Sequence, residues 1–165
     1  KILKVKQTYS PSMDIQISSN FERQIFESIQ RDSHKLKKIF NSFEKNGVYN
    51  FEQKILDDFK KLYDVSSVND DETLQTISKV FKLYNYTSDP HTATGLKILL
   101  DKNSDESWVS LVCAHPAKFG EVVEKATNVN LELPKELSKI FDKNEKMTIL
   151  PNDTKKIKNF ILQNI

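Results

Sequence analysis

The segment Trp108-Val109-Ser110-Leu111-Val112-Cys113-Ala114-His115-Pro116-Ala117-Lys118-Phe119 joins an apolar run to a polar turn. The apolar run 108–112 predicts a short buried strand. Pro116 follows the turn, so a helix is expected to begin there. Open α/β sheets bind their ligands at such places, where polar side chains at the carboxyl end of a strand lie beside the positive end of a helix. The segment therefore predicts an α/β fold with a ligand site beside this turn.

Helices dominate the rest of the predicted fold. Apolar residues recur at helical spacing in about seven or eight stretches, whereas only two or three indicate strands, among them 14–18 and 108–112. Two strands cannot form a stable sheet alone, so either helices cover them or they complete a sheet whose other strands lie elsewhere. The second reading fits a chain that begins at Lys1 rather than at Met. We therefore expect a predominantly helical α/β fold whose few strands are completed by a missing N-terminal part.

Local signals indicate where several helices begin and end. Ser19-Asn20-Phe21-Glu22 matches a capping box, in which a serine and a glutamate satisfy each other's backbone donors. Asn46-Gly47 is typical of a helix C-terminus. Asp89-Pro90 is typical of a helix start, with Asp as the cap and Pro in the first turn. Further helix starts are expected at Asn50, Pro134 and Asn152-Asp153.

Composition limits the classes of function. Lys and Arg number 25 and Asp and Glu 23, and the net charge of +2 predicts no strong attraction to nucleic acid or to a membrane surface. The lone Cys113 cannot form an intrachain disulfide, which indicates a reducing, cytoplasmic setting. Three scattered glycines, Gly47, Gly95 and Gly120, cannot form a phosphate-binding loop. The three His and one Cys lack the paired spacing of metal ligands, so no metal site is expected.

Three polar segments carry a resemblance to a known family. Their order and rough spacing match threonine synthase, a pyridoxal 5'-phosphate (PLP) enzyme, and together they span about residues 10–126. The helical stretch of roughly 32–75 carries no matching motif. The matching segments are Pro11-Ser12-Met13-Asp14-Ile15 with Ser18-Ser19-Asn20-Phe21-Glu22-Arg23, then Asp89-Pro90-His91-Thr92-Ala93 with Gly95, and finally Ala114-His115-Pro116-Ala117-Lys118-Phe119.

The resemblance implies an enzyme that converts O-phosphohomoserine and water to threonine and phosphate, with the fold of tryptophan-synthase-β-like PLP enzymes. It places the Schiff-base lysine and the Gly-rich phosphate loop upstream of this sequence, so the fragment alone is expected to be inactive and to hold no catalytic residue. Residues 1–165 then form a single C-terminal fragment. In it, about 10–31 and 89–126 belong to the cofactor-side α/β domain, and about 32–86 form a helical accessory region.

Cys113, Ala114 and His115 are the expected cofactor-binding residues. By the resemblance, Cys113 occupies the position of a threonine that hydrogen-bonds the pyridine nitrogen of PLP. A thiol donates more weakly than a hydroxyl, yet it is also a neutral partner, whereas a carboxylate would hold the ring nitrogen protonated. The alternative makes Cys113 a small buried residue at a strand end. On the same alternative, His115 is a helix-entry residue bonded to the backbone.

Ser19, Asn20, His91 and Thr92 are the expected substrate-binding residues. The backbone donors in the first turn of a helix favour an anion, and the implied substrate carries a carboxylate and a phosphate. The alternative is plain capping by Asp89, with His91 and Thr92 packed against their neighbours.

Two other classes of function compete with this reading. One is a non-catalytic helical binding or regulatory module that retains the family fold. The other is a freestanding hydrolase built on Cys113 and His115, for which no third, orienting group is evident. Threonine synthase is favoured because three polar strings are present where a scaffold would need only apolar ones.

Overall fold

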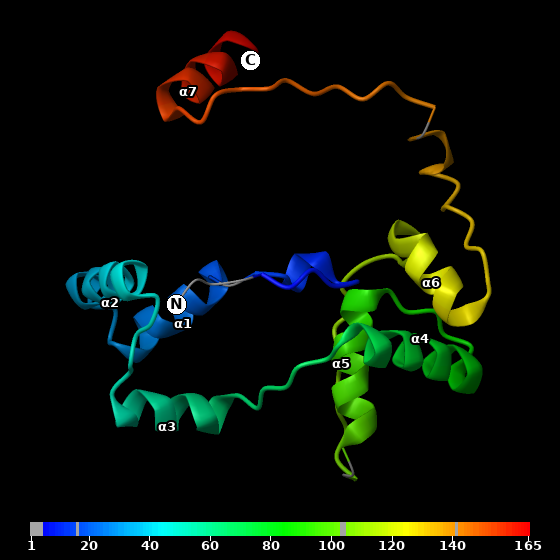
Figure 1. The fold of residues 1–165 in the computed structure, drawn as a ribbon, viewed down its shortest axis with the longest axis horizontal. Helices are drawn as coiled ribbons and strands as arrows, with labels where there is room; N and C mark the ends of the chain where they lie inside the picture. Colours follow the sequence, from blue (N-terminus) through cyan, green and yellow to red (C-terminus); the bar gives the residue numbers. More distant parts are fainter. Residues whose placement is uncertain (1–4, 16, 103–104, 141) are drawn as a thin grey trace. The chain divides into compact units, whose positions relative to one another are not determined.

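The structure, a computed structural model, describes residues 5–15, 17–102, 105–140 and 142–165. Within these ranges every regular element is a helix, and the chain divides into two compact units, Lys1–Leu131 and Glu132–Ile165. The helices shown in Figure 1 are α1 (Ser19–Ser28), α2 (Ser33–Asn46), α3 (Gln53–Leu62), α4 (Asp70–Tyr84), α5 (Pro90–Asp101), α6 (Gly120–Thr127) and α7 (Thr154–Gln163), with 3-10 turns η1 (Pro11–Met13), η2 (Pro116–Phe119) and η3 (Ser138–Ile140).

Helices α1, α2 and α3 pack around a cluster of isoleucines. Ile25 and Ile39 are buried at its centre, as the helical spacing predicts. Helix α2 ends at Gly47, whose φ of 67° favours a residue without a Cβ. Helix α1 begins one residue earlier than expected, because the side chain of Ser18, rather than that of Ser19, accepts the backbone N–H of Phe21. Of these helices, α2 and α3 fall within the expected accessory region of about 32–86, whereas α1 falls within 10–31, and the division into these regions stays a prediction.

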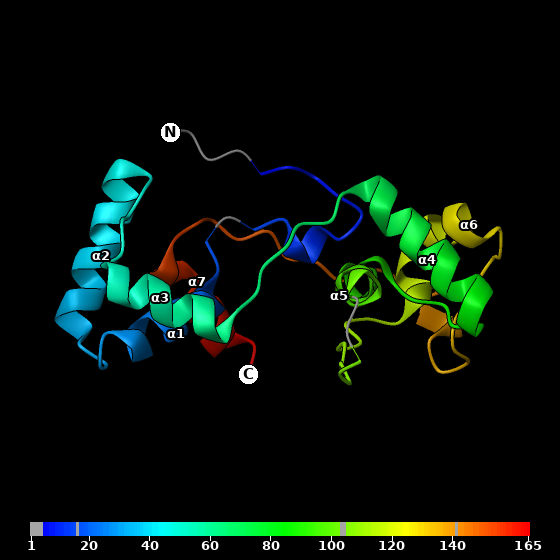
Figure 2. The same cartoon turned by 90° about the horizontal axis from the view of Figure 1, so that it is seen from below.

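Helix α4 packs against both α5 and α6 in the same unit, and Figures 1 and 2 show the three helices side by side. Ile77 and Val123 are fully buried in this second core. Helix α4 begins at Asp70 because Asn69 and Glu72 form a capping box just before and within its first turn. The N-terminal segment belongs to this group of helices, since the N–H of Tyr9 donates to a carboxylate oxygen of Asp70 at 3.0 Å.

Both predicted strands are absent from the described residues. The stretch 14–18 is irregular, with Gln16 outside the described residues, and 108–112 is neither strand nor helix. Val109 and Leu111 are 86% and 80% exposed rather than buried. A strand needs a neighbour to satisfy its backbone donors and acceptors, and the described part of the chain offers none.

Of three further expected helix starts, two differ and one is confirmed. The N-cap of helix α3 is Glu52, whose side chain makes no capping bond, and not Asn50. After Pro134 only the short turn η3 forms, and Phe141 lies outside the described residues. Helix α7 starts as predicted, because Asp153 accepts the N–H groups of Lys155 and Lys156.

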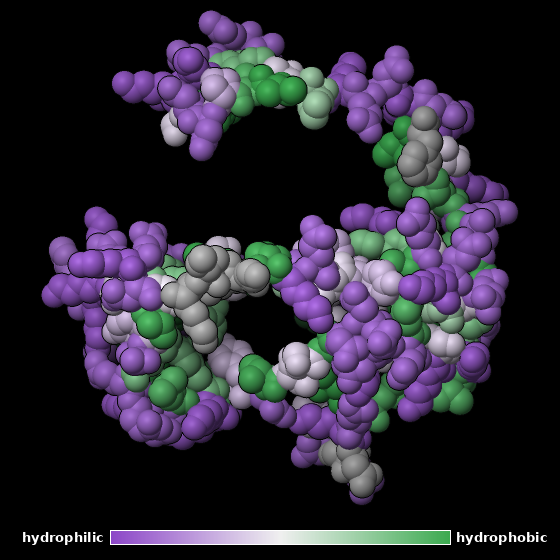
Figure 3. Space-filling view, in the orientation of Figure 1, coloured by the Kyte–Doolittle hydropathy of each residue, from purple (hydrophilic) through white to green (hydrophobic). Residues whose placement is uncertain are grey.

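Helix α7 is amphipathic and stands in the second unit. Its apolar residues include Ile157, Ile161 and Leu162, all exposed, and Figure 3 shows apolar surface along one side of the helix. A membrane span would require a longer and more apolar helix than any found in the described residues.

The irregular segment before Cys113 runs along α5 in the opposite direction. Gly95 lies at a close approach of the two, because a Cβ on Gly95 would stand only 2.6 Å from the hydroxyl oxygen of Ser110. Further on, Cys113 and Ala114 bond to the start of α5. The segment is therefore held on α5 although it forms no strand.

We expect Gly95→Ala to stabilise the protein in a Ser110→Ala background. Alanine favours a helix interior by about 0.5–1 kcal/mol over glycine, and the nearest remaining atom, Cβ of residue 110, would lie at an ordinary 3.8 Å. With Ser110 intact, the gain in unfolding free energy should shrink, because the hydroxyl must rotate away. Urea unfolding of the four proteins tests this, and an equal gain in both backgrounds would contradict it.

Candidate functional site

The site is centred on Asp89, whose side chain caps α5. Asp89 is 1% exposed, and its Oδ1 accepts the backbone N–H groups of His91 at 2.9 Å and Thr92 at 3.4 Å. Its Oδ2 accepts the hydroxyl of Thr92 and the backbone N–H of Ala114, the latter at 3.3 Å. One buried carboxylate therefore joins the start of α5 to a turn 25 residues away.

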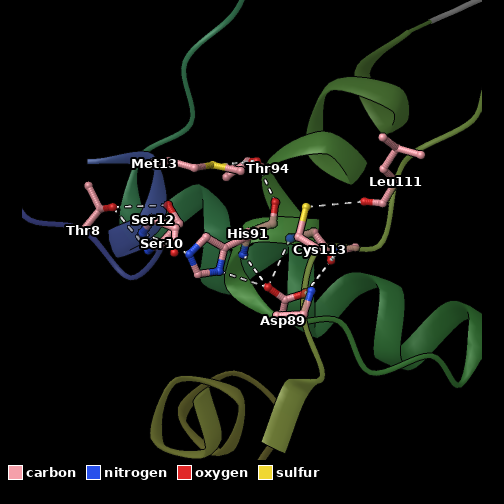
Figure 4. Close-up of polar contacts among 11 residues, drawn as sticks. Thr8, Ser10, Ser12, Met13, Asp89, His91, Thr94, Leu111 and Cys113 are labelled. Carbon is pink, nitrogen blue, oxygen red and sulfur yellow. Dashed lines mark hydrogen bonds and ion pairs between the residues drawn. The ribbon is translucent and has the colours of Figure 1, made fainter. Parts of the chain in front are cut away.

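His91 fixes a second connection. The N–H of Ser12 donates to Nε2 of His91 at 3.2 Å, and Nδ1 of His91 lies 3.1 Å from Oδ1 of Asp89 (Figure 4). Because a backbone N–H can only donate, Nε2 is the acceptor nitrogen and Nδ1 carries the proton toward Asp89. The ring of Phe119 packs on the imidazole, with centroids 4.8 Å apart. His91 is thereby tied to η1 and η2 at once.

Thr92 binds the backbone of Cys113. The N–H of Cys113 donates to the hydroxyl oxygen of Thr92 at 2.9 Å, while that hydroxyl donates its own proton to Asp89. The Cys113 thiol is exposed, and its sulfur lies 3.6 Å from the carbonyl oxygen of Leu111 (Figure 4). The backbone of Cys113 is fixed, and its thiol faces solvent.

These contacts bring together the three segments that carry the family resemblance. Ser12 comes from the first, Asp89 with its two neighbours from the second, and Ala114 and Phe119 from the third. His91 and Cys113, which come from two distant segments, thus lie together at the start of α5, whereas Asn20 makes none of these contacts.

Hydrogen bonding keeps Asp89 ionised. Burial by itself raises the pKa of this carboxyl, but hydrogen bonds from the Thr92 hydroxyl, from the N–H groups of His91 and Thr92, and from the His91 ring outweigh it and hold the pKa below the ordinary 3.8. The charged form is therefore the one that the fold stabilises.

The helix start offers little to an anion. The N–H groups of His91 and Thr92 already donate to Asp89, and Pro90 has none. The side-chain polar atoms of His91 and Thr92 are engaged as well. Direct substrate binding by these two residues stays a prediction, and their contacts favour a supporting role.

The remaining predicted site residues lie apart from this network or at its edge. His115 is exposed and caps η2, its Nδ1 accepting the N–H of Ala117 at 3.2 Å. Ser19 and Asn20 are exposed at the start of α1, and within the described residues neither bonds to the network around Asp89. Arg23 donates to the amide oxygen of Asn20 rather than to an acid.

Sequence reasoning missed the roles of Ser12 and Phe119, and the buried serine beside Asp89. Both Ser12 and Phe119 stood in the resembling segments, so their presence there was the available signal. Ser88 is 1% exposed, and its hydroxyl is the one buried side-chain polar atom in the described chain without a hydrogen-bond partner. No group of three His, Cys, Asp or Glu side chains able to hold a metal occurs among the described residues.

Comparisons with known proteins point to one family. The family described as "Threonine synthase, C-terminal" matches residues 92–161. Threonine synthase of Pseudomonas aeruginosa is 36% identical over 157 residues, covering 93% of this chain and 34% of that protein. Threonine synthase of Saccharomyces cerevisiae is 34% identical over 184 residues, covering 96% of this chain and 36% of that protein. The chain thus spans about a third of the length of these relatives.

Solved structures agree with the sequence comparisons. The crystal structure of PLP-bound threonine synthase from Brucella melitensis matches with a TM-score of 0.83 and 35% identity, covering 99% of this chain and 35% of that one. The yeast threonine synthase structure matches with a TM-score of 0.79 and 31% identity, covering 98% of this chain and 38% of that one.

We expect Asp89→Asn to lower the unfolding free energy by about 1.5–3 kcal/mol at neutral pH, because an amide cannot accept all the bonds that the carboxylate accepts. A lowered folded-state pKa contributes stability above the unfolded pKa, and this is lost as pH falls through the folded value. The difference between wild type and variant should therefore narrow below about pH 4.

Urea unfolding over a pH series measures this difference. Ser88→Ala is the matched control, since it removes a buried hydroxyl that has no partner, and it should leave the unfolding free energy unchanged or higher. A difference for Asp89→Asn that does not vary with pH would rule out the carboxylate charge as its source.

Proposed function

Because this chain is homologous to the C-terminal part of threonine synthase, we propose that it forms one wall of a PLP-dependent active site. The reaction proposed for the complete enzyme converts O-phosphohomoserine and water to threonine and phosphate. The observation that carries the proposal is the meeting of the three resembling segments at the start of α5. Residues far apart in sequence would not need to share this polar network in a scaffold held by apolar packing alone.

The residues beside α5 fit one edge of the cofactor. PLP, when bound, supplies an electron sink for the substrate carbon atoms. The pyridine nitrogen requires a single partner, and the exposed thiol of Cys113 on a fixed backbone is suited to that role. The backbone of Ala114 and the exposed imidazole of His115 lie next to it in the chain and complete this edge of the proposed site.

The remaining cofactor contacts are assigned to the part of the enzyme that the relatives have beyond this chain. A lysine that binds PLP covalently and a loop that holds its phosphate belong there on this proposal. The exposed apolar run 108–112 supports the division, because Val109 and Leu111 stand in solvent as they would in a strand without its sheet. We propose that this run completes a sheet in the whole enzyme.

The substrate side of the proposed site is formed by Ser19 and Asn20. Both are exposed at the N-terminus of α1, and the Asn20 amide oxygen is already oriented by Arg23. His91 and Thr92 support the site from behind, since they are buried and fully hydrogen-bonded. Helices within about 32–86 are the accessory region beside it.

The native protein that contains this chain should release phosphate and threonine from O-phosphohomoserine when PLP is present, whereas the 165-residue chain alone should release neither. The physical reason is that the chain supplies one edge of the cofactor site and no lysine for it. A colorimetric phosphate assay with amino-acid analysis measures both products. If the native protein forms no threonine from O-phosphohomoserine, a non-catalytic module is favoured instead.

Cys113→Asp in the native protein should reduce kcat by at least about tenfold, because a carboxylate holds the pyridine nitrogen protonated where a thiol does not. Cys113→Ser is the matched control and should retain most of the turnover, since a hydroxyl is also a neutral partner. Steady-state kinetics distinguish the two. Equal turnover of Cys113→Asp and wild type would remove Cys113 from the site.

A further inference from the structure

Two buried side chains at the start of α5 hold the backbone on which the proposed cofactor-facing thiol stands. Thr92, 2% exposed, accepts the N–H of Cys113, and Asp89, 1% exposed, accepts the N–H of Ala114. We name these two side chains and the two amides they hold the α5 clamp. Its hydrogen bonds link consecutive residues of the turn to one helix terminus.

We infer that Asp89 and Thr92 are positioning residues, which present the thiol of Cys113 to the pyridine nitrogen of PLP by fixing the backbone amides of Cys113 and Ala114. The inference rests on the proposed function, and it deepens that function by assigning what places the thiol. It gives Thr92 a role other than contact with substrate.

The Cys113 side chain has little else to fix it. The thiol is exposed, and its one hydrogen bond within the described chain is a long contact with the carbonyl of Leu111, two residues earlier on the same segment. The flanking Val112 is exposed as well, so packing does not hold the turn from its outer side. The direction of the thiol therefore depends on the backbone, and the backbone depends on the α5 clamp.

The α5 clamp is itself rigidly supported. The Thr92 hydroxyl has a defined orientation because it donates to Asp89 while accepting from Cys113. Asp89 is held by the first turn of α5 and by His91, whose ring accepts the N–H of Ser12 (Figure 4). The ring of Phe119 packs on the same imidazole. A positioning role needs such support, because a reacting group displaced by about 1 Å loses much of its effect.

The test uses variants of the native protein, one of them also in a Cys113→Ala background. Thr92→Val keeps the shape of the side chain and removes its hydroxyl, and Thr92→Ser restores the hydroxyl. Thr76→Val is the matched control, since Thr76 is equally buried but its hydroxyl donates to the carbonyl of Glu72 within α4. Amide hydrogen exchange at Cys113 and the dissociation constant of PLP, from titration of its absorbance, are measured for each.

We expect Thr92→Val to exchange the Cys113 amide about fivefold faster and to weaken PLP binding by a similar factor. Thr92→Ser should restore both values, and Thr76→Val should leave both near wild type. In a Cys113→Ala background, Thr92→Val should weaken PLP binding by less than about twofold, because the thiol it positions is already absent.

Two results would overturn the inference. One is an unchanged rate of exchange at Cys113 in Thr92→Val. The other is a loss of PLP affinity that is equally large with and without the thiol, which would show a general structural effect. A native protein that binds no PLP would instead overturn the proposed function, and with it the cofactor-facing part of the inference, while the exchange measurement would still report on the α5 clamp.

Discussion

The arrangement of the site depends on a single buried carboxylate. Asp89 accepts hydrogen bonds from the start of its own helix and from a turn distant in sequence, and it also orients His91, which holds the N-terminal segment. A buried charge is costly unless it is fully hydrogen-bonded, and this one is satisfied by groups from two segments. The chain must therefore bring those segments together in order to bury Asp89 at all.

No strand forms within the described residues, and the reason is again whether a segment finds a partner. The run 108–112 is apolar and lies along α5, where a Cβ on Gly95 would meet the hydroxyl of Ser110, yet its outer side chains are exposed. One face of the segment is satisfied by the helix, and the other has no partner in the described chain. On the function proposed above, this run pairs with a sheet in another part of the whole enzyme.

Features that depend on near neighbours in sequence were predictable, and features that depend on distant partners were not. The start of α5 at Asp89 and the end of α2 at Gly47 follow from local capping chemistry, and both are confirmed. The cap of α1 was misplaced by one residue because two adjacent serines can both serve. The predictions of strands were wrong for the described residues, because strand pairing depends on partners distant in sequence.

At the site too, features set by near neighbours in sequence were predicted and those set by distant contacts were not. The resemblance pointed to the segments that meet at the site. It could not show that the Thr92 hydroxyl and both ring nitrogens of His91 are already hydrogen-bonded to other residues of the chain. Nor could it show that Asn20 lies on a different helix start, bonded to Arg23. The number of hydrogen bonds a group has left to make is a property of the folded chain.

The turn at residues 113 and 114 is held through its backbone N–H groups, and this has a consequence for its evolution. Every amino acid except proline carries the amide hydrogen that this bond requires, so the side chain at position 113 can change without losing the bond to Thr92. A lineage can thus exchange a hydroxyl for a thiol here while the geometry of the turn persists. Proline is the exception, because it has no N–H to donate to Thr92.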